Sequence, residues 1–149
     1  MPLGAVISII HRAHQIILND RLKPYGLTFG QFPVLMMLSH HQNITQEMLA
    51  RHFRIDKGTI ARAVKKLEDA GYVRRITDPE NRRAVRLFLT EKGVQIVPVI
   101  KQIDREWEDM TCTGISTENR THTYVLLRNL AQTSIDATRT MGDISNAPE

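Results

Sequence analysis

The chain contains 149 residues, 42% of them hydrophobic and 24% charged, with a formal net charge of +4 at pH 7. These values match an average globular protein and exclude a wholly disordered chain, a collagen and a disulfide scaffold. The single cysteine, Cys112, cannot form an intrachain disulfide, which favours a reducing compartment. The longest apolar run, residues 32–38, is far shorter than the roughly 20 residues that span a bilayer. Residues 3–10 lack the basic segment and cleavage site of a signal peptide, so we expect a cytoplasmic protein without a membrane partner.

The positive charge is concentrated in one part of the chain. Residues 51–86 carry eleven Lys and Arg against five Asp and Glu, a net charge of +6, whereas the other 113 residues have a net charge of −2. A basic segment within an acidic remainder favours a local surface that binds a polyanion. The alternative is a solvated helix face with scattered cations, so the positions of the cations on the secondary structure must decide between the two.

The N-terminal segment, residues 3–22, predicts a helix with a wide apolar surface. Apolar residues recur there at helical spacing, at Leu3, Val6, Ile10, Ala13 and Ile17. Further isoleucines and a leucine extend this stripe beyond one face of the helix. Such a helix needs more than one partner, either at the centre of the fold or in a second subunit. The sequence Pro-Tyr-Gly at residues 24–26 ends it.

Capping signals predict three further helices before residue 71. Thr28-x-x-Gln31 is a capping box that opens a helix running to about residue 38, and Pro33 should bend this helix or shift its start. Thr45 caps a short helix that ends near residue 52. Asp56 caps a longer helix that lasts to residue 70.

Two strands and two long helices are expected after residue 70. Residues 72–77 and 84–89 flank a turn and are rich in β-branched and apolar residues, which predicts a hairpin. Thr90 then caps a helix to about residue 110, and Ser116 caps a last helix that ends near residue 141. The remaining residues, 142–149, are expected to form a flexible tail.

The third and fourth predicted helices have the spacing of a helix-turn-helix, because three or four residues separate them. One face of the fourth helix carries the apolar residues Ile60, Ala63, Val64 and Leu67. If that face packs inward, the opposite face presents cations and small residues that let the backbone approach a DNA groove. Asp56 is expected to act as a cap, and the alternative for Lys65 is a solvated side chain. The candidate DNA-binding residues of this unit are Thr45, Lys57, Gly58, Thr59, Ala61, Arg62 and Lys65.

The hairpin places a charged turn directly after the helix-turn-helix. Its tip contains the adjacent Arg82 and Arg83, which can insert a guanidinium into a narrow A·T-rich minor groove. The alternative is an ordinary charged hairpin tip, and the cationic helix before it argues against that alternative. A helix-turn-helix followed by a two-stranded ribbon is the order of elements in a winged helix.

Five motifs together resemble the MarR family of transcriptional regulators. They are Ile44-Thr-Gln-Glu-Met-Leu-Ala-Arg51, Asp56-Lys-Gly-Thr-Ile-Ala-Arg62, Leu67-Glu-Asp-Ala-Gly-Tyr-Val-Arg-Arg75, Asp78-Pro-Glu-Asn-Arg-Arg-Ala-Val85 and Leu89-Thr-Glu-Lys-Gly93. The resemblance covers about residues 28–93, and the flanking helices agree in pattern rather than in residues. It implies a homodimeric winged helix whose first, fifth and sixth helices form the dimer interface.

One wing position departs from the family pattern. The family has Asp-x-Arg, then five residues, then Leu-Thr; here Arg83 takes the Arg position and Leu89-Thr90 follow. Asn81 stands where the family usually has Asp, which helps to hold the wing arginine. Arg83 is therefore expected to be held less rigidly, or to be held by Asp78 or Glu80 instead.

The resemblance also implies an effector cleft that draws on the first, second and fifth helices. Members of the family commonly release DNA when a small phenolic or aromatic carboxylate enters this cleft. Arg12 offers a bidentate fork for such a carboxylate, and His11 and Tyr25 are candidate lining residues. The alternative for Arg12 is an interhelical or intersubunit salt bridge.

Redox, metal and catalytic functions have less support. Cys112 has no predicted cationic neighbour, so a buried or inert thiol is favoured over a redox sensor. His11-x-x-His14 and His40-His41 do not complete a set of four zinc ligands. The sequence contains no P-loop, Gly-x-Ser-x-Gly or Gly-x-Gly-x-x-Gly motif. We therefore expect no metal, no cofactor and no enzymatic activity.

The expected fold is mainly helical, with a winged helix-turn-helix and its two-stranded wing over residues 28–90. Residues 1–24 and 91–141 are expected to form a helical dimerisation domain. The expected function is that of a homodimeric repressor, which binds a pseudo-palindromic operator in double-stranded DNA and is relieved by a small aromatic carboxylate. One alternative is a protein-interaction module in which Arg74, Arg75 and Arg86 face an acidic protein partner. Another is a ligand-binding protein with vestigial DNA affinity.

Overall fold

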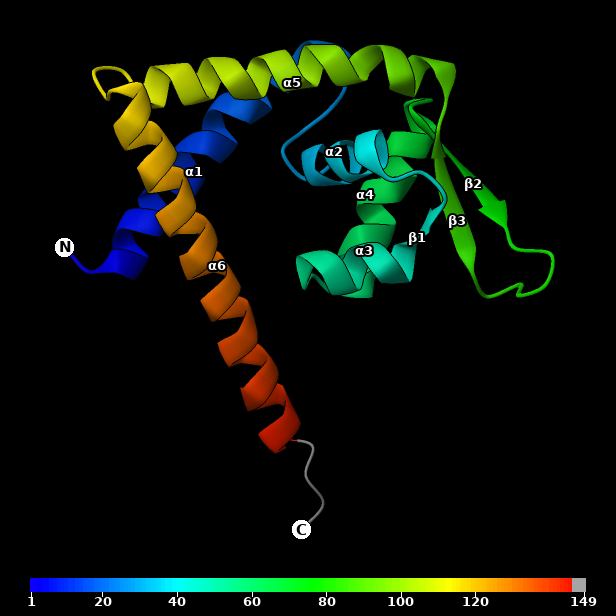
Figure 1. Cartoon of the computed structure of the whole chain (residues 1–149). Helices are drawn as coiled ribbons and strands as arrows, with labels where there is room; N and C mark the ends of the chain where they lie inside the picture. The colour runs from blue at the N-terminus through cyan, green and yellow to red at the C-terminus, as the bar shows by residue number, and fades with distance from the viewer. Residues whose placement is uncertain (146–149) are drawn as a thin grey trace. The chain divides into compact units, whose positions relative to one another are not determined.

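The structure is a computed structural model that describes residues 1–145, with side chains through residue 138. Its helices are α1 (Leu3–Leu22), the 3-10 helix η1 (Lys23–Tyr25), α2 (Phe32–His40), α3 (Gln46–Phe53), α4 (Lys57–Asp69), α5 (Glu91–Thr111) and α6 (Thr117–Ser145) (Figure 1). Its strands are β1 (Ile44–Thr45), β2 (Val73–Thr77) and β3 (Val85–Leu89). The chain divides into two compact units, Met1–Glu108 and Asp109–Glu149.

The second helix begins later than its capping box predicts. The side-chain oxygen of Gln31 accepts hydrogen bonds from both the backbone N–H and the hydroxyl of Thr28, each at 2.8 Å. These bonds stabilise a non-helical turn over residues 29–31. The helix α2 therefore starts at Phe32, with Pro33 in its first turn. Proline fits there because its missing N–H would have no partner within the helix. Of the two expected effects of Pro33, the shifted start is the one observed.

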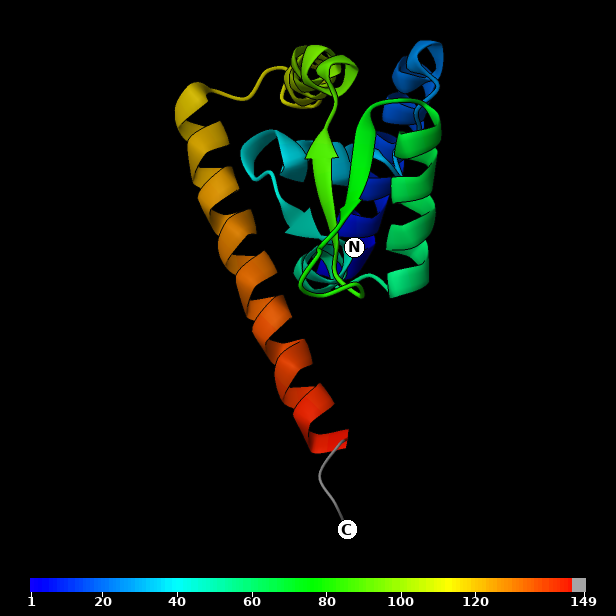
Figure 2. The same cartoon turned by 90° about the vertical axis from the view of Figure 1, so that its right-hand side faces the viewer.

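The sheet has three strands, whereas the sequence predicts only two. The short strand β1 pairs antiparallel with β3, with Ile44 opposite Leu87 and Thr45 opposite Arg86. The strand order is therefore β1-β3-β2, and in Figure 2 the sheet lies beside α4. Two residues are too few for a pattern of alternating side chains, so the sequence gives no local sign of this strand.

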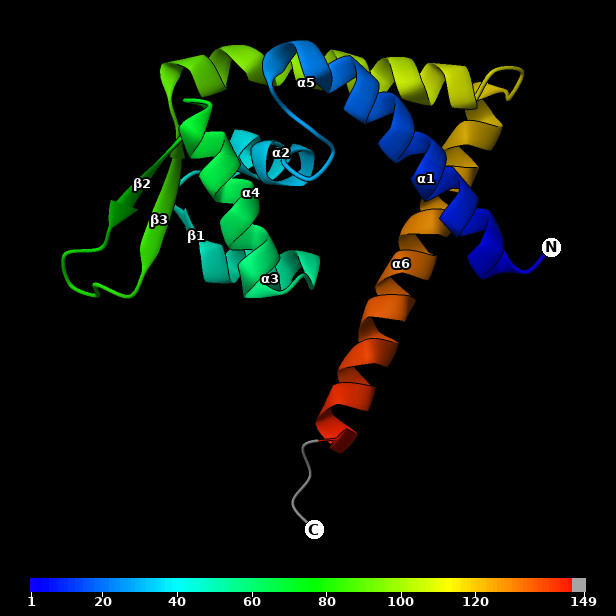
Figure 3. The same ribbon diagram turned by 180° about the vertical axis from the view of Figure 1, so that it is seen from behind.

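The helix-turn-helix forms with the caps that the sequence predicts. The Thr45 hydroxyl accepts from the backbone N–H of Met48 at 3.1 Å, and the Asp56 carboxylate accepts from that of Thr59 at 2.8 Å. Between the two helices Arg54 adopts a left-handed conformation with φ of 53°. In Figures 1 and 3, α3 lies on the side of α2 that faces away from α5, and α4 runs from α3 back toward the start of α5.

One hydrophobic core joins the helices and the sheet of the first unit. Helices α1 to α5 and strands β2 and β3 contribute fully buried leucines, valines or isoleucines, among them Leu18, Leu35, Leu49, Val64, Leu67, Leu87 and Ile100. Burial of each such side chain contributes about 1.5–3 kcal/mol. The buried face of α4 consists of the four predicted residues, Ile60, Ala63, Val64 and Leu67. The burial of this face determines which residues of α4 are exposed on the opposite face.

The start of α5 packs directly on the segment that leads into the wing. A Cβ atom on Gly93 would lie 2.0 Å from the carbonyl oxygen of Tyr72, so this contact requires glycine. The backbone N–H of Thr90 donates to the same Tyr72 carbonyl at 3.0 Å, and the Thr90 hydroxyl donates to the carbonyl of Gly71 at 2.6 Å. These contacts fix the first residues of β2 relative to α5.

In the second unit, α6 extends further than expected. It runs to Ser145, so residues 142–145 continue the helix, and the rest of the predicted tail lies outside the described residues. Arg120 anchors its first turns by donating to the carboxylate of Asp109 at 3.2 Å and to the carbonyl of Cys112 at 2.9 Å. None of the helices described over residues 1–145 combines the length and apolarity needed to cross a membrane.

Arg86 forms an ion pair within the wing and a hydrogen bond to the loop before β1. The Arg86 guanidinium donates to Asp78 at 2.9 Å from Nη2 and at 3.1 Å from Nε, and its Nη1 reaches the side-chain oxygen of Asn43 at 3.2 Å. The Asp78 carboxylate also accepts from the backbone N–H of Glu80. The bond from Glu80, followed by the bond from Arg86, lowers the pKa of Asp78 below its ordinary value of 3.8.

This ion pair makes wing stability depend on pH. Because the pKa of Asp78 is lower in the folded state, its contribution is present above pH 3.8 and is lost as the pH falls through the folded value. We expect Asp78→Asn to lower the free energy of unfolding at pH 7, and the difference from wild type to shrink below pH 4. Urea unfolding between pH 7 and pH 3 measures this difference. Glu80→Gln is the matched control, and a difference for Asp78→Asn that stays constant with pH would contradict the assignment.

Candidate nucleic-acid interface

The exposed face of α4 begins with a connected set of polar groups. The Asp56 carboxylate caps the helix and accepts from the Thr59 hydroxyl at 2.6 Å, and that hydroxyl accepts from Nη2 of Arg62 at 2.8 Å. The bonds from the Thr59 side chain and backbone lower the pKa of Asp56, with a smaller contribution from the charge of Arg62. Arg62 is exposed, so its guanidinium is held at the surface of the first two turns.

Glu47 on α3 partly neutralises two cations of this surface. Its carboxylate lies 3.7 Å from the Arg51 guanidinium and 3.7 Å from the Lys57 ammonium, and all three side chains are well exposed. The pair of Glu47 and Arg51 follows from their spacing of four residues. The pair with Lys57 joins different helices, and sequence reasoning missed it. Exposed pairs of this kind contribute about 0–1 kcal/mol each, so either cation can exchange Glu47 for another anion.

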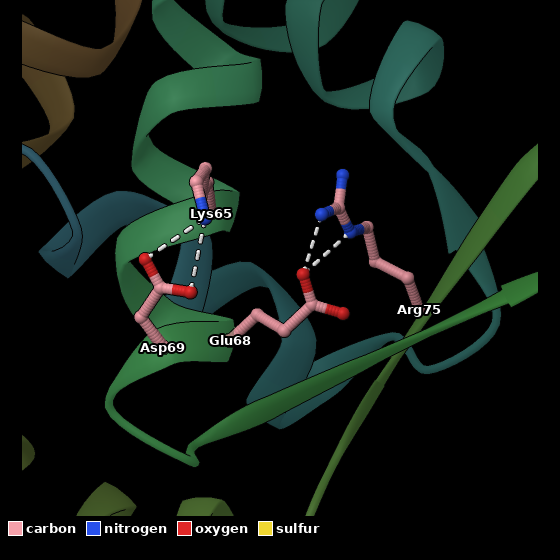
Figure 4. Close-up of polar contacts among 4 residues, drawn as sticks. All are labelled: Lys65, Glu68, Asp69 and Arg75. Atoms are coloured by element: carbon pink, nitrogen blue, oxygen red, sulfur yellow. Dashed lines mark hydrogen bonds and ion pairs between the residues drawn. The ribbon is translucent and has the colours of Figure 1, made fainter.

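The two carboxylates near the end of α4 are paired with nearby cations. Figure 4 shows Lys65 directed toward Asp69, at 3.1 Å, and Arg75 of β2 directed toward Glu68, at 2.8 Å from Nε. The hydrogen bond with Glu68 raises the pKa of Arg75 above its ordinary value. Lys65 is thus a partner of Asp69 as well as a DNA-binding candidate, and the acidic end of α4 is locally neutralised.

Other cations of the basic segment have internal partners too. The Arg74 guanidinium lies 5.4 Å from the centre of the Phe88 ring, and Arg86 is held by Asp78 and Asn43. Together with Arg75, these are the residues that a docking module would present to an acidic partner. Each of them is occupied within the fold, which reduces its availability for such a partner.

The wing turn leaves its two arginine side chains unpaired. Asn81 accepts from the backbone N–H of Arg83 at 3.2 Å, so it shapes the turn without holding the guanidinium. The Asp78 carboxylate is taken by Arg86. Over the described residues, the side chains of Arg82 and Arg83 make neither a hydrogen bond nor an ion pair. Of the two expectations for Arg83, the less rigidly held side chain agrees with this geometry.

The structure places the remaining candidates of the helix-turn-helix as follows. Gly58 is exposed at the start of α4, and Ala61 is half-buried one turn further along. The Thr45 hydroxyl is used by the cap of α3, which leaves it less free for a DNA contact than the sequence implies. The first two turns of α4 therefore bring together Lys57, Gly58, Thr59, Ala61 and Arg62.

The candidate effector residues do not gather at one site. An open cavity of about 790 Å³ lies between the end of α1, η1 and α5, and Tyr25 lines it. Its charged lining residues are Asp20, Arg21 and Glu106. Arg12 is exposed elsewhere on α1, and the His11 ring lies edge-on to Phe29 at 5.4 Å. Sequence reasoning missed Arg21, although it lies one helical turn before Tyr25.

His14 and Cys112 contact other residues of the fold. The His14 ring is stacked on Trp107, with centroids 3.9 Å apart, and its Nε2 lies 3.0 Å from the Asp104 carboxylate. Cys112 is half-buried, and its carbonyl accepts from Arg120, a cation that the sequence does not place there. Within the part of the chain that the structure describes, no group of three or more His, Cys, Asp or Glu side chains is arranged so that it could hold a metal ion.

Comparison with known proteins places this geometry in a family. The model of the MarR family matches residues 27–85. The HTH-type transcriptional regulator YybA of Bacillus subtilis is 32% identical over 124 residues, which are 83% of each chain. A MarR transcriptional regulator from Methanosarcina mazei has a TM-score of 0.88 and 38% identity, over 91% of this chain and 97% of its own.

A neighbour solved with DNA has the same fold. It is a MarR-family regulator from Listeria monocytogenes in complex with a 26mer DNA, with a TM-score of 0.87, 27% identity and coverage of 100% of this chain and 99% of its own. These relatives are transcriptional regulators and not enzymes, in agreement with the absence of catalytic motifs from the sequence. On the sequence identity, the fold and the helix-turn-helix with its wing, the chain belongs to the MarR family of winged-helix transcriptional regulators.

Proposed function

We propose that this chain is a homodimeric repressor that binds a pseudo-palindromic operator in double-stranded DNA. The observation that carries the proposal is the division of charge along α4. Its first two turns expose Lys57 and Arg62 beside Gly58, whereas the carboxylates at its other end are paired with Lys65 and Arg75. The Listeria monocytogenes neighbour in complex with DNA supports the same class of ligand.

In the proposed complex the start of α4 enters the major groove. The N-terminus of a helix attracts phosphate oxygens, and the small residues Gly58 and Ala61 let the backbone approach the bases. A phosphate takes the place of Glu47 beside Lys57, because the exposed pair at 3.7 Å is weak. Thr45 and Lys65 are the outer candidates, since each already has a partner in the free protein.

The wing supplies the second contact of the proposed complex. Arg82 and Arg83 lie on a turn that projects from β2 and β3, and neither guanidinium has a protein partner among the described residues to give up. The minor groove of an A·T-rich sequence has the most negative potential and attracts such a side chain. The wing therefore contributes preference for A·T-rich flanks.

Two helices supply apolar surface for the proposed dimer. On α1 the exposed apolar residues are Leu3, Val6, Ile7, Ile9, Ile10 and Ile16. On α6 they are Tyr124, Val125, Leu126, Leu127 and Leu130. Contiguous exposed apolar surface marks a site of association, and a second copy of the chain is the partner that the family resemblance implies. Two copies present two recognition helices, as a pseudo-palindromic operator requires.

The effector proposed for the repressor is a small aromatic carboxylate that binds the cavity of about 790 Å³. Tyr25 and Pro98 offer flat apolar surface there, and Arg21 offers a guanidinium. The Arg21 guanidinium lies 3.9 Å from Glu106 and both are half-exposed, so a ligand carboxylate can replace this weak partner. The lining supports Arg21, rather than Arg12, as the carboxylate partner.

The contacts of α4 and the wing are tested by two substitutions. Lys57→Ala should weaken binding to all duplexes alike and lower the slope of log affinity against log salt by about one. Arg83→Ala should weaken binding chiefly to operators with A·T-rich flanks. For the wild type, neutralisation of roughly 6–10 phosphates predicts a loss of about 10³–10⁵ in affinity between ~50 and ~200 mM salt. Fluorescence anisotropy with an operator selected from genomic fragments measures all three effects.

Lys23→Ala is the matched control, because it removes an exposed cation of η1 outside the helix-turn-helix and the wing. Its salt slope should equal that of the wild type. A flat salt dependence of the wild type, or unchanged affinities of both test variants, would contradict the proposed interface. No binding to any duplex at moderate salt would favour the protein-interaction module.

The dimer is tested by placing charge on its two apolar faces. Ile10→Glu with Leu127→Glu should convert a dimer to a monomer in analytical ultracentrifugation. Operator affinity should then fall about 10²–10⁴-fold, because the two half-sites are no longer bound together. Gln15→Glu adds the same charge at a polar position of α1 and should preserve the dimer. A wild-type chain that is monomeric at micromolar concentration would contradict the proposal.

The effector site is tested with salicylate as the probe. Arg21→Gln should raise the salicylate concentration that releases half of the bound DNA about 10- to 100-fold, the loss of one charge-assisted hydrogen bond. Arg12→Gln should leave that concentration unchanged. The reverse result would place the carboxylate at Arg12, and no release from the wild type would reject this class of effector. A true regulator also binds salicylate less tightly when DNA is bound, which separates it from a ligand-binding protein with vestigial DNA affinity.

A further inference from the structure

Arg62 differs from Lys57 and Lys65, the other cationic DNA-binding candidates of α4, in the group that holds it. Lys57 lies beside a Glu47 carboxylate and Lys65 is bound by Asp69, so each must leave an anion before it meets DNA. Arg62 instead donates from Nη2 to the neutral hydroxyl of Thr59 at 2.8 Å. It is held in place without direct contact with an opposite charge.

The Thr59 hydroxyl is itself fixed by the helix cap. Its single proton is donated to the Asp56 carboxylate at 2.6 Å, which leaves oxygen lone pairs free to accept from Arg62. The Thr59 backbone N–H donates to the other Asp56 oxygen at 2.8 Å. The direction of the hydroxyl proton is therefore set, and the position of the Arg62 guanidinium follows from it.

The neighbouring glycine leaves room for this arrangement. A Cβ atom on Gly58 would lie 3.2 Å from Oδ1 of Asp56 and 3.3 Å from Nη1 of Arg62. Both distances are tighter than ordinary van der Waals contact, so a side chain at this position would push against the Asp56 carboxylate and the Arg62 guanidinium. The missing side chain thus serves the guanidinium as well as a close approach of the backbone to DNA.

We propose that Thr59 is a positioning residue that aims Arg62 at a guanine in the major groove. The inference rests on the proposed DNA-binding function. It adds the residue whose position sets the preference for guanine at one base pair of the operator. A guanidinium has five N–H donors, and the bond to Thr59 uses one of them, so a pair remains for O6 and N7 of guanine. Because the fork is already oriented, Arg62 loses less rotamer freedom on binding, and its contact distinguishes bases rather than merely adding charge.

The test separates positioning from both charge and helix stability. Wild type, Arg62→Ala, Thr59→Val and Thr59→Ser are each used to select sequences from a random duplex library at physiological salt. Valine keeps the branched shape of threonine and the backbone bond to Asp56 but removes the hydroxyl. Serine keeps the hydroxyl. We expect the wild type to enrich one guanine in each half-site, and Arg62→Ala to lose the preference at that position.

Thr59→Val should reduce the preference for that guanine about 5- to 150-fold, the range for one bidentate base contact, and should reduce affinity for random duplex by a much smaller factor. Thr59→Ser should retain the preference. The inference is overturned if Thr59→Val keeps the preference that Arg62→Ala loses, or if it weakens operator and random DNA equally. If the wild type enriches no sequence at all, the proposed function fails as well, so the two failures are distinguishable.

Discussion

Burial of one face of α4 is the constraint on which the rest of the interface depends. An α-helix turns 100° per residue, so placing Ile60, Val64 and Leu67 in the core leaves no choice about which residues face outward. Lys57 and Arg62 are exposed for the same reason that Val64 is fully buried. The hydrophobic energy that forms the fold therefore also orients the cationic surface. A shift of the buried stripe by one residue would bury part of that surface and expose part of the core.

The charges of the helix-turn-helix are arranged by distance from the start of α4. Near the start, carboxylates are few, and Asp56 is committed to the cap by its bonds to Thr59. At the far end, Glu68 and Asp69 are paired with Arg75 and Lys65. The pair of Glu68 and Arg75 joins α4 to β2, and the pair of Lys65 and Asp69 lies within α4. Neutralising these carboxylates therefore removes repulsion toward DNA and also stabilises the junction of helix and strand.

Features of the fold that depend on neighbours in sequence could be predicted, and features that depend on distant contacts could not. Thr45 and Asp56 act through residues three positions away, so the caps and the two helices follow from the sequence. The strand β1 exists only because Ile44 meets Leu87, forty-three residues later. The contact of Lys57 with Glu47 and the cavity at Tyr25 likewise require the folded chain. For the site, pairs of residues four positions apart follow from the spacing, whereas partners that lie on different elements do not.

Those partners decide how the cations of one surface differ in function. In the proposed complex, Lys57 and Lys65 each exchange an exposed carboxylate for a phosphate, and the loss of the carboxylate offsets part of their attraction to DNA. Among the side chains that the structure describes, those of Arg82 and Arg83 have no such pair to exchange, and their attraction is strongest for the minor groove of A·T-rich DNA. Arg62 keeps its bond to Thr59 and gains only where the base offers matching acceptors. Carboxylates such as Glu47 thus reduce the attraction common to all sequences without weakening base recognition, which raises the ratio of specific to non-specific binding.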